Sequence, residues 1–447
     1  AGVDTSDHEV NIKILIDQAV AAGELDQDAR RKLLADMSDE VASQVLRNTY
    51  LQNQAITMMK AFSTERLGSM GHFISVLESD GQLDRGLEYL PGDEELAERR
   101  ERGEGLTRPE LSVLLSYSKI RLYQQLLDSD VPEDGWLSGE AVNYFPSEIR
   151  DRYAGYVSSH RLKREIIATQ VTNSLVNRMG ASFVLRARED TGASPGEVAR
   201  AYTIVREVFE ARDYWQKLEK LDNRVDSDLQ VVAQLNMWEL LRQATRWLLN
   251  LPNRDLDIGR MVKRLAGGVA EMEAAIRQNL TADERAALVL ATQRFKQGGF
   301  SARLAQRAAL LDYLFPALDV VETAARRRTR VDRVAGISFA LGGMFKFNWL
   351  RREIESQDVA GKWHAISRAN LRDELFTHHN RMVESVLMQH GRKKDPVAAW
   401  TQAHSAGVQE VSTMLAQMRS QGEMDYATIA VALRALGQLA DDTPNEQ

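Results

Sequence analysis

The sequence predicts an all-α protein. Long stretches repeat apolar residues at the 3.6-residue spacing of a helix, and the two-residue alternation of a half-buried strand is nearly absent. Only 9 of the 447 residues are proline, and most of these stand at the edges of the helical stretches. We therefore expect many helices joined by polar connections.

Three helix starts can be recognised from capping boxes, which begin at Thr107, Ser194 and Thr281. In this motif a Ser or Thr side chain accepts from the backbone amide three residues later, and a Glu at that position reaches back. Pro109 is tolerated in the first turn because its missing N–H would have no partner within the helix. These motifs therefore predict the start of a helix at three separate places in the chain.

Breaks between the helical stretches predict the domain organisation. The segment before residue 107 is rich in glycine and charge, and turns or polar hinges interrupt the later helical stretches near residues 252 and 392. The predicted parts are residues 1–78 with two or three helices, residues 79–106 as a charged, glycine-rich connection containing a helical turn, residues 107–438 as a helical C-terminal domain with sub-boundaries near 252 and 392, and residues 439–447 as a disordered tail.

Composition and charge exclude several classes of protein. The net charge of −7 favours neither nucleic acid nor an anionic membrane as a partner. The chain has no cysteine, which excludes disulfides, thiolate metal sites and a cysteine nucleophile.

The longest apolar candidate, residues 336–345, is too short for a membrane span, and the N-terminus has no signal-peptide pattern. A cytoplasmic location is the simplest interpretation. The first residue is not Met, so the chain is expected to belong to a longer polypeptide.

Known cofactor and metal motifs are missing from the sequence. No glycine-rich dinucleotide turn and no phosphate-binding loop is present. His378 and His379 are adjacent, with only Glu374 and Glu384 near ligand spacing. We therefore expect no metal site there, and a surface or capping role for the two histidines.

Three other groups of residues have a structural and a functional interpretation. The arginines at 326–333 could bind an anion or nucleic acid, but we favour a solvated or ion-paired face because no aromatic residues are interleaved. The aromatic residues Phe345, Phe347 and Trp349 are expected in the core. The third group is polar and lies on a predicted helix, where we favour hydrogen-bonded links between helices over ligand contacts; it comprises Gln170, Thr172, Asn173, Ser174 and Asn177.

The first ten residues are predicted to form a loop that leads into a helix. Asp4 or Thr5 is the expected N-cap of that helix. Gly2 permits close approach of the backbone to another group, and a helix N-terminus favours a bound anion.

Several long strings of this sequence resemble the C-terminal part of the large bacterial NAD-dependent glutamate dehydrogenases. The resemblance extends from Ala1 to about residue 390 and is weaker after that. It implies that residues 1–78 are the terminal segment of a Rossmann-type catalytic domain. The matching strings are AGVDTSDHEVNIKIL, GLTRPELSVLLSYSKI, YFPSEIRDRYAGYVSSHRLKREIIATQVTNSLVNRMG and ISFALGGMFKFNWLRREI.

The resemblance also implies roles for three residues. Ala1-Gly2-Val3 is similar to the end of the Asn-Ala-Gly-Gly-Val element that lines the nicotinamide–substrate cleft in that family. Ser6 stands where the family has a serine that holds the side-chain carboxylate of glutamate. Ser6 is thus a candidate for binding substrate, and Ala1 and Gly2 are candidates for contact with NAD. The family's catalytic Lys and Asp lie upstream of residue 1, so no catalytic residue is assigned to this chain.

The implied reaction converts L-glutamate, NAD and water to 2-oxoglutarate, ammonium and NADH. NAD would be bound mainly by upstream residues, and the implied partners are the chain's own upstream catalytic region and further copies in a homo-oligomer. The chain alone is expected to be inactive, and NADH formation above a boiled control would contradict this. The alternative is a non-catalytic helical module that binds a partner subunit or an effector.

Overall fold

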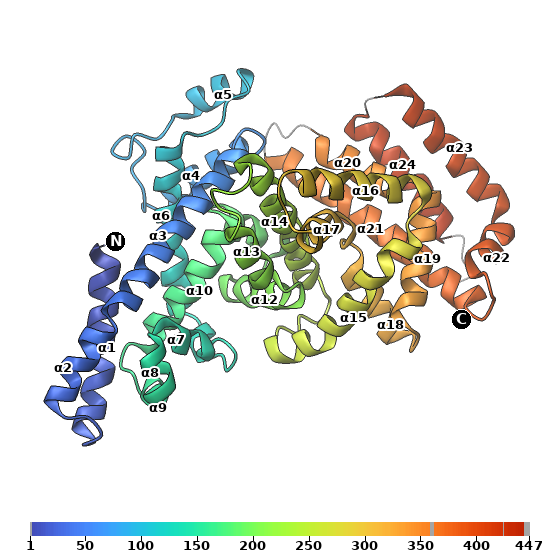
Figure 1. Ribbon diagram of the computed structural model, residues 1–447. Coiled ribbons are helices and arrows are strands. Elements are labelled where there is room, and N and C mark those ends of the chain that lie inside the picture. Colours follow the sequence, from blue (N-terminus) through green and yellow to red (C-terminus); the bar gives the residue numbers. More distant parts are fainter. Residues whose placement is uncertain (1, 358–361, 423, 442–447) are drawn as a thin grey trace. The chain divides into compact units, whose positions relative to one another are not determined.

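The computed structural model describes residues 2–357, 362–422 and 424–441 of the chain. These residues form helices and connecting loops without any strand, which confirms the all-α prediction (Figure 1). The chain divides into two compact units. Unit 1 comprises residues 1–204 and 248–259, and unit 2 comprises residues 205–247 and 260–447.

The first half of the chain supplies most of unit 1, and the last helix of this half continues into unit 2 from residue 205. The helices of this half are α1 (Gly2–Ala21), α2 (Gln27–Asp36), α3 (Ser38–Ala61), α4 (Leu67–Ser79), α5 (Asp93–Glu101), α6 (Arg108–Leu127), the short 3-10 helix Val131–Glu133, α7 (Ser138–Tyr144), α8 (Ser147–Arg152), α9 (Ala154–Val157), α10 (Lys163–Met179), α11 (Phe183–Thr191) and α12 (Pro195–Val208).

The second half supplies most of unit 2. Its helices are α13 (Ala211–Glu219), α14 (Ser227–Leu249), α15 (Ile258–Asn279), α16 (Ala282–Gln297), α17 (Ala302–Leu310), the 3-10 helix Leu311–Tyr313, α18 (Ala317–Arg326), α19 (Val331–Met344), α20 (Phe347–Ser356), α21 (Lys362–His390), α22 (Pro396–Ala403), α23 (Ser405–Gln421) and α24 (Tyr426–Asp441).

The three predicted capping boxes are confirmed. The backbone N–H groups of Thr107, Ser194 and Thr281 donate to the Glu carboxylate three residues later, at 2.6, 2.7 and 3.1 Å. Arg99, from α5, adds two N–H donors to the carboxylate of Glu110 at 2.8 and 2.9 Å. Local sequence thus determines where α6, α12 and α16 begin.

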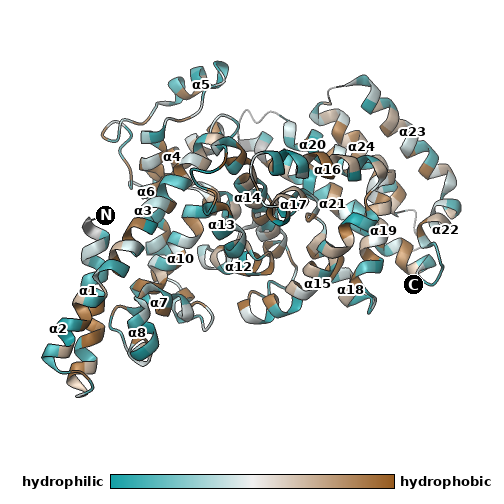
Figure 2. Cartoon of the chain, in the orientation of Figure 1, coloured by the Kyte–Doolittle hydropathy of each residue, from teal (hydrophilic) through white to brown (hydrophobic). Residues whose placement is uncertain are grey.

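The core of unit 1 is built around α10, which packs against α3, α6 and α7. Helix α3 also packs against α6. Residues on both sides of the predicted connection 79–106 therefore share one core, and this connection does not separate two compact units. The connection contains α5, in which hydrophilic residues predominate (Figure 2).

The core of unit 2 is built around α21, which packs against α19, α20, α22 and α24. Gly437 of α24 lies close to His378 of α21, where a Cβ would come within 2.7 Å of the imidazole Cε1. Glycine is therefore required for this approach of α24 to α21. Trp400 of α22 is fully buried and donates from Nε1 to Ser385 Oγ at 2.9 Å.

Two predicted features near the chain ends differ in the structure. Residues 2–10 already belong to helix α1, so the loop predicted over the first ten residues and the N-cap predicted at Asp4 or Thr5 are both wrong. An acidic residue such as Asp4 is favourable there because the helix dipole is positive at its N-terminus. Helix α24 includes residues 439–441 of the predicted tail, and residues 442–447 lie outside the described residues.

Within the described part of the chain, no helix combines the length and the apolar composition that crossing a membrane requires.

Candidate functional site

Helix α1 has a buried face and an exposed face, and this division places the predicted substrate residue. Ser6 is exposed and precedes the buried His8 by two residues. At about 100° per residue, this separation puts the two side chains on roughly opposite sides of the helix. The buried face carries His8, Asn11, Ile12, Leu15, Ile16 and Ala19, none of them more than 4% exposed.

Tyr144, the last residue of α7, forms hydrogen bonds with α1. Its hydroxyl donates to Asp7 Oδ2 at 2.7 Å and accepts from Asn11 Nδ2 at 3.0 Å. Asn11 Nδ2 also donates to Asp7 Oδ1 at 3.1 Å. Burial and the hydrogen bond to Asp7 raise the pKa of the Tyr144 hydroxyl, so it stays protonated at neutral pH.

His8 stacks on the ring of Tyr144 at the same place. Burial lowers the pKa of His8, and the negative charges of Asp7 and Asp4 partly oppose this shift. The imidazole is therefore neutral at pH 7, where its ring packs as an aromatic group.

His160 connects α1 to the segment that precedes α10. Its Nε2 lies 3.0 Å from the backbone carbonyl of Asn11, which can only accept, so Nε2 carries the proton. Its Nδ1 accepts from the backbone N–H of Leu162 at 3.1 Å. Burial lowers the pKa of His160. The ring is thus held as one neutral tautomer by two backbone groups.

Lys119 of α6 is an unusual group near the N-terminal turns of α1. Its Nζ is buried and has no hydrogen-bond partner among the described residues. Burial lowers the pKa of the amine to about 8, while the charge of Asp4 acts in the opposite direction. Sequence reasoning missed this residue, because the apolar pattern of α6 marks the position only as part of a helix.

The predicted site residues occupy the N-terminal end of α1. The hydroxyl of Ser6 belongs to the exposed face, just beyond the first turn, whose backbone N–H groups have no partners within the helix. Gly2 is the first residue of α1, and Ala1 lies outside the described residues. This arrangement presents a hydroxyl near a helix N-terminus, which is chemically suited to a carboxylate.

The histidines of α21 do not have the predicted surface or capping role. His378 and His379 are both buried, because α19 and α24 cover α21. His379 Nε2 donates to the Ser338 carbonyl at 2.9 Å, and burial lowers its pKa to about 4. His378 lies 3.3 Å from Glu374 Oε1. No cluster of three or more His, Cys, Asp or Glu residues that could hold a metal ion occurs in the described ranges.

Three arginines of the cluster at 326–333 are ion-paired, in agreement with the predicted solvated or ion-paired face. Arg326 and Arg327 both pair with Glu384, the latter at 3.5 Å. Arg330 pairs with Asp332 at 2.6 Å.

The polar residues of α10 are only partly explained by hydrogen bonds between helices. Tyr202 donates to the backbone carbonyl of Ser174 at 3.0 Å, which does link α12 to α10. However, Thr172 Oγ1 and Asn177 Oδ1 are buried without a hydrogen-bond partner among the described residues. The prediction of paired polar side chains is wrong for these two atoms.

Comparison with known families decides what kind of chain this is. Residues 103–438 match the family described as "Glutamate dehydrogenase, C-terminal", which is well over half of the chain. The chain belongs to the glutamate dehydrogenase family. Residues 1–59 match a second description, "Bacterial NAD-glutamate dehydrogenase, catalytic domain", and this range contains α1 and Ser6.

Individual relatives agree with this membership in the glutamate dehydrogenase family. A protein of Pseudomonas aeruginosa named NAD-specific glutamate dehydrogenase is 38% identical over 445 residues, or 99% of this chain and 28% of the relative. Proteins of the same name from Halomonas elongata and Mycobacterium tuberculosis are 37% and 30% identical, each over 98% of this chain and 27% of the relative. The chain thus spans little more than a quarter of the length of these glutamate dehydrogenases.

Sequence reasoning also missed the residues that hold α1 of this glutamate dehydrogenase segment. Tyr144 and His160 lie within one string that carries the family resemblance, but nothing in the string shows that their partners are Asp7 and Asn11. These contacts join positions far apart in the chain, which a single sequence does not reveal.

Proposed function

We propose that this chain is the C-terminal region of an NAD-dependent glutamate dehydrogenase, and that α1 completes its substrate cleft. The proposed reaction is the oxidative deamination of L-glutamate to 2-oxoglutarate and ammonium. The observation that carries the proposal is the two-sided character of α1. One face is fixed by Tyr144 and His160, and Ser6 is exposed on the other.

In this proposal the hydroxyl of Ser6 donates a hydrogen bond to the side-chain carboxylate of glutamate. The positive end of the α1 dipole favours the same charge. NAD, when bound, supplies the hydride acceptor. The candidates for contact with NAD remain Ala1 and Gly2, of which Gly2 lies within the described residues. Proton transfer is assigned to the Lys and Asp of the upstream region.

The helical remainder of the chain acts as a scaffold in this proposal. It holds α1 at a fixed rotation about its axis, and rotation decides which residues α1 presents. The proposed parts remain residues 1–78 as the end of the catalytic domain, 79–106 as the connection and 107–438 as the helical C-terminal domain. A homo-oligomeric assembly and a cytoplasmic location also belong to the proposal, and sedimentation and cell fractionation would test them.

The substitution Ser6→Ala in the complete polypeptide tests the proposal. Loss of a hydrogen bond to a charged group is expected to raise KM for glutamate by about tenfold or more, with little change in KM for NAD. Ser43→Ala is the matched control, since Ser43 is exposed on α3 and bonds only the backbone of Asp39. Unchanged glutamate kinetics in the Ser6 variant would remove Ser6 from the substrate site.

The alternative function is a helical interaction module without a catalytic role. Val289 and Leu290 favour it, because these neighbouring side chains of α16 are 50% and 66% exposed. If they contact a partner subunit, Leu290→Asn should weaken self-association in analytical ultracentrifugation. A complete polypeptide that forms no NADH from glutamate would leave this alternative as the better explanation.

A further inference from the structure

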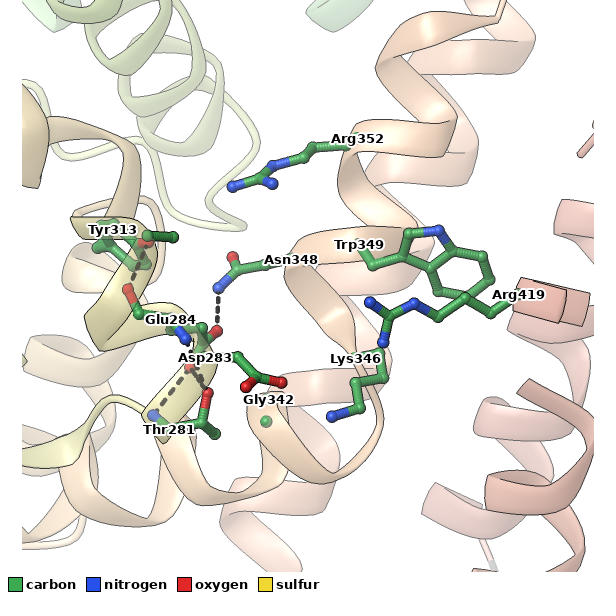
Figure 3. Close-up of a pocket in the computed structure, with 12 residues that line it drawn as sticks. Thr281, Asp283, Glu284, Tyr313, Gly342, Lys346, Asn348, Trp349, Arg352 and Arg419 are labelled. Atoms are coloured by element: carbon green, nitrogen blue, oxygen red, sulfur yellow. Dashed lines mark hydrogen bonds between the residues drawn. The ribbon is translucent and has the colours of Figure 1, made fainter. Parts of the chain in front are cut away.

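Unit 2 contains a cavity of about 220 Å³ that is separate from α1 (Figure 3). It lies between the start of α16, the end of α19, the start of α20 and a residue of α23. The side chains that matter for its chemistry are Asp283, Lys346, Asn348, Trp349, Arg352 and Arg419.

Three cationic side chains line this cavity, and they are poorly neutralised. The structure gives Lys346 and Arg419 no hydrogen bond or ion pair with any described residue, and both are exposed. Arg352 lies 3.5 Å from Asp312, but this carboxylate also accepts from Arg351 at 2.6 Å. Positive charge therefore exceeds the negative charge available to pair with it.

Two carboxylates line the cavity, and they differ in their hydrogen bonds to the described residues. Glu284 belongs to the capping box of α16, and its carboxylate also accepts from Asn348 Nδ2 at 2.5 Å. Asp283 has no such partner among the described residues, and Figure 3 shows it across the cavity from Lys346 and Arg419. The donors to Glu284 are neutral groups, so its charge counts as well. The carboxylates of Asp283 and Glu284 together balance two of the three cations, which leaves an excess of one positive charge.

The backbone at the start of α20 adds to this excess. Its N-cap is Lys346, which has a φ of 55° and provides no side-chain cap, and the first turn contains no acidic residue. The amide groups of this turn are therefore free to attract an anion. The left-handed conformation of a non-glycine residue costs free energy and is typical of functional positions.

A smaller cavity of about 40 Å³ adjoins the first and shares Asn348 with it. It is lined by Arg351, whose side chain is only 8% exposed. The Nε of Arg351 is buried without an acceptor in the described part of the chain. The guanidinium of Arg351 is ion-paired with Asp312, but a buried N–H without an acceptor indicates that an oxygen of a ligand or of water belongs in this smaller cavity.

We propose that this cavity binds a small organic anion that carries at least two carboxylate or phosphate groups. Two anionic groups match the spread of Lys346, Arg352 and Arg419 around the opening. The volume corresponds to about seven water molecules at roughly 30 Å³ each, which suits a small metabolite. The site lies wholly within unit 2 and does not depend on the role proposed for Ser6.

Isothermal titration calorimetry of the complete polypeptide at constant ionic strength tests the proposal. The probes are propane-1,2,3-tricarboxylate and inorganic pyrophosphate, with acetate as the singly charged comparison. We expect the first or the second probe to bind at least about tenfold more tightly than acetate. Tighter binding of the tricarboxylate identifies carboxylates as the natural groups, and tighter binding of pyrophosphate identifies phosphates. If neither multiply charged probe binds better than acetate, the proposal is wrong.

Variants locate the binding in this cavity. Lys346→Asn with Arg419→Gln removes two charges, and Asn tolerates the left-handed backbone, so binding should weaken by about tenfold or more. Lys296→Gln with Arg303→Gln removes the same charge from exposed positions of unit 2 outside the cavity and should leave binding unchanged. Equal losses in both double variants would show that only overall charge matters and would overturn the proposal.

The substitution Asp283→Asn should change the affinity for the anion in the opposite direction. Removing the charge of Asp283 should strengthen anion binding severalfold, since the repulsion between this carboxylate and the anion disappears. A gain in affinity cannot result from misfolding, so this variant decides the question even if the double variant is unstable. Unchanged or weaker binding by Asp283→Asn would contradict the proposed site.

Discussion

The imidazole ring of His8 lies nearly parallel to the phenol ring of Tyr144, with centroids 4.3 Å apart and an angle of 10° between the planes. This stack joins the first helix of the chain to α7, and the hydroxyl of the same tyrosine bonds Asp7 and Asn11. The ring and the hydroxyl of Tyr144 thus act on α1 in different ways. Substitutions can separate the two contributions.

We predict that Tyr144→Phe destabilises the chain although it keeps the ring. The change leaves Asp7 and Asn11 without the hydroxyl, and loss of a partly buried hydrogen bond to a charged group costs about 1–3 kcal/mol. Urea unfolding measures the difference in free energy of unfolding. Tyr89→Phe, at a tyrosine that is 89% exposed, is the control and should change stability by less than about 0.5 kcal/mol. Equal effects of the two variants would mean that the hydrogen bonds contribute nothing.

Lys119→Met should stabilise the chain at neutral pH. The folded pKa of Lys119 is about 8, below the ordinary 10.5, so below pH 8 the folded state carries the cost of a buried charge. That cost is at most on the order of 3 kcal/mol, decreases between pH 8 and 10.5, and is absent above. Urea unfolding at pH 7 and pH 10.5 should show a gain for the variant at pH 7 only. Lys32→Met, at an exposed lysine of α2, controls for the general loss of charge. A gain that is independent of pH would contradict this explanation.

His379 should make unit 2 sensitive to acid. Its folded pKa of about 4 lies below the ordinary 6.5, so its contribution to stability is complete above pH 6.5 and is lost as the pH falls towards 4. The loss is on the order of 3 kcal/mol. His379→Gln should cost stability at pH 7, and this cost should shrink as the pH falls to 4.5. The exposed His364→Gln is the comparison. A cost that stays constant with pH would show that His379 does not titrate on unfolding.

Two helical glycines, Gly267 within α15 and Gly343 near the end of α19, should respond oppositely to alanine. A Cβ on Gly343 of α19 would clash with Thr281 Cγ2, so Gly343→Ala should lower the melting temperature through a cost of about 1–3 kcal/mol. A Cβ on Gly267 of α15 would meet no atom within 4 Å. Gly267→Ala should therefore raise stability by about 0.5–1 kcal/mol, because glycine loses more backbone freedom on folding. A stabilising Gly343→Ala would mean that α19 can move away from the start of α16.

The features that the sequence predicted well depend on neighbouring residues. The capping box at Thr281 needs only the next three positions, and it forms as expected. Phe345 and Phe347 were predicted in the core and are buried there. The start of α1 was placed too late, because Asp4 and Thr5 are good N-cap residues that can equally occupy a first turn.

The features that could not be predicted depend on tertiary contacts. His379 looks like a surface residue until α19 and α24 are seen to cover α21. Trp349 was assigned to the core together with its aromatic neighbours, but it is half-buried and lines the cavity. Arg419 comes to that cavity from a separate helix, and no local pattern connects it with Lys346.

The hydrogen bonds around Tyr144 also limit which substitutions residues 7, 11 and 144 can accept during evolution. Hydrogen bonds join the side chains of Asp7, Asn11 and Tyr144, and His160 uses the backbone of Asn11. Losing the hydroxyl alone removes one hydrogen bond from the exposed Asp7 and one from the buried Asn11, whereas replacing the set together with apolar groups can be nearly neutral. The side chains at 7, 11 and 144 should therefore co-vary during descent, while position 160 should tolerate any change at 11 that keeps α1 helical.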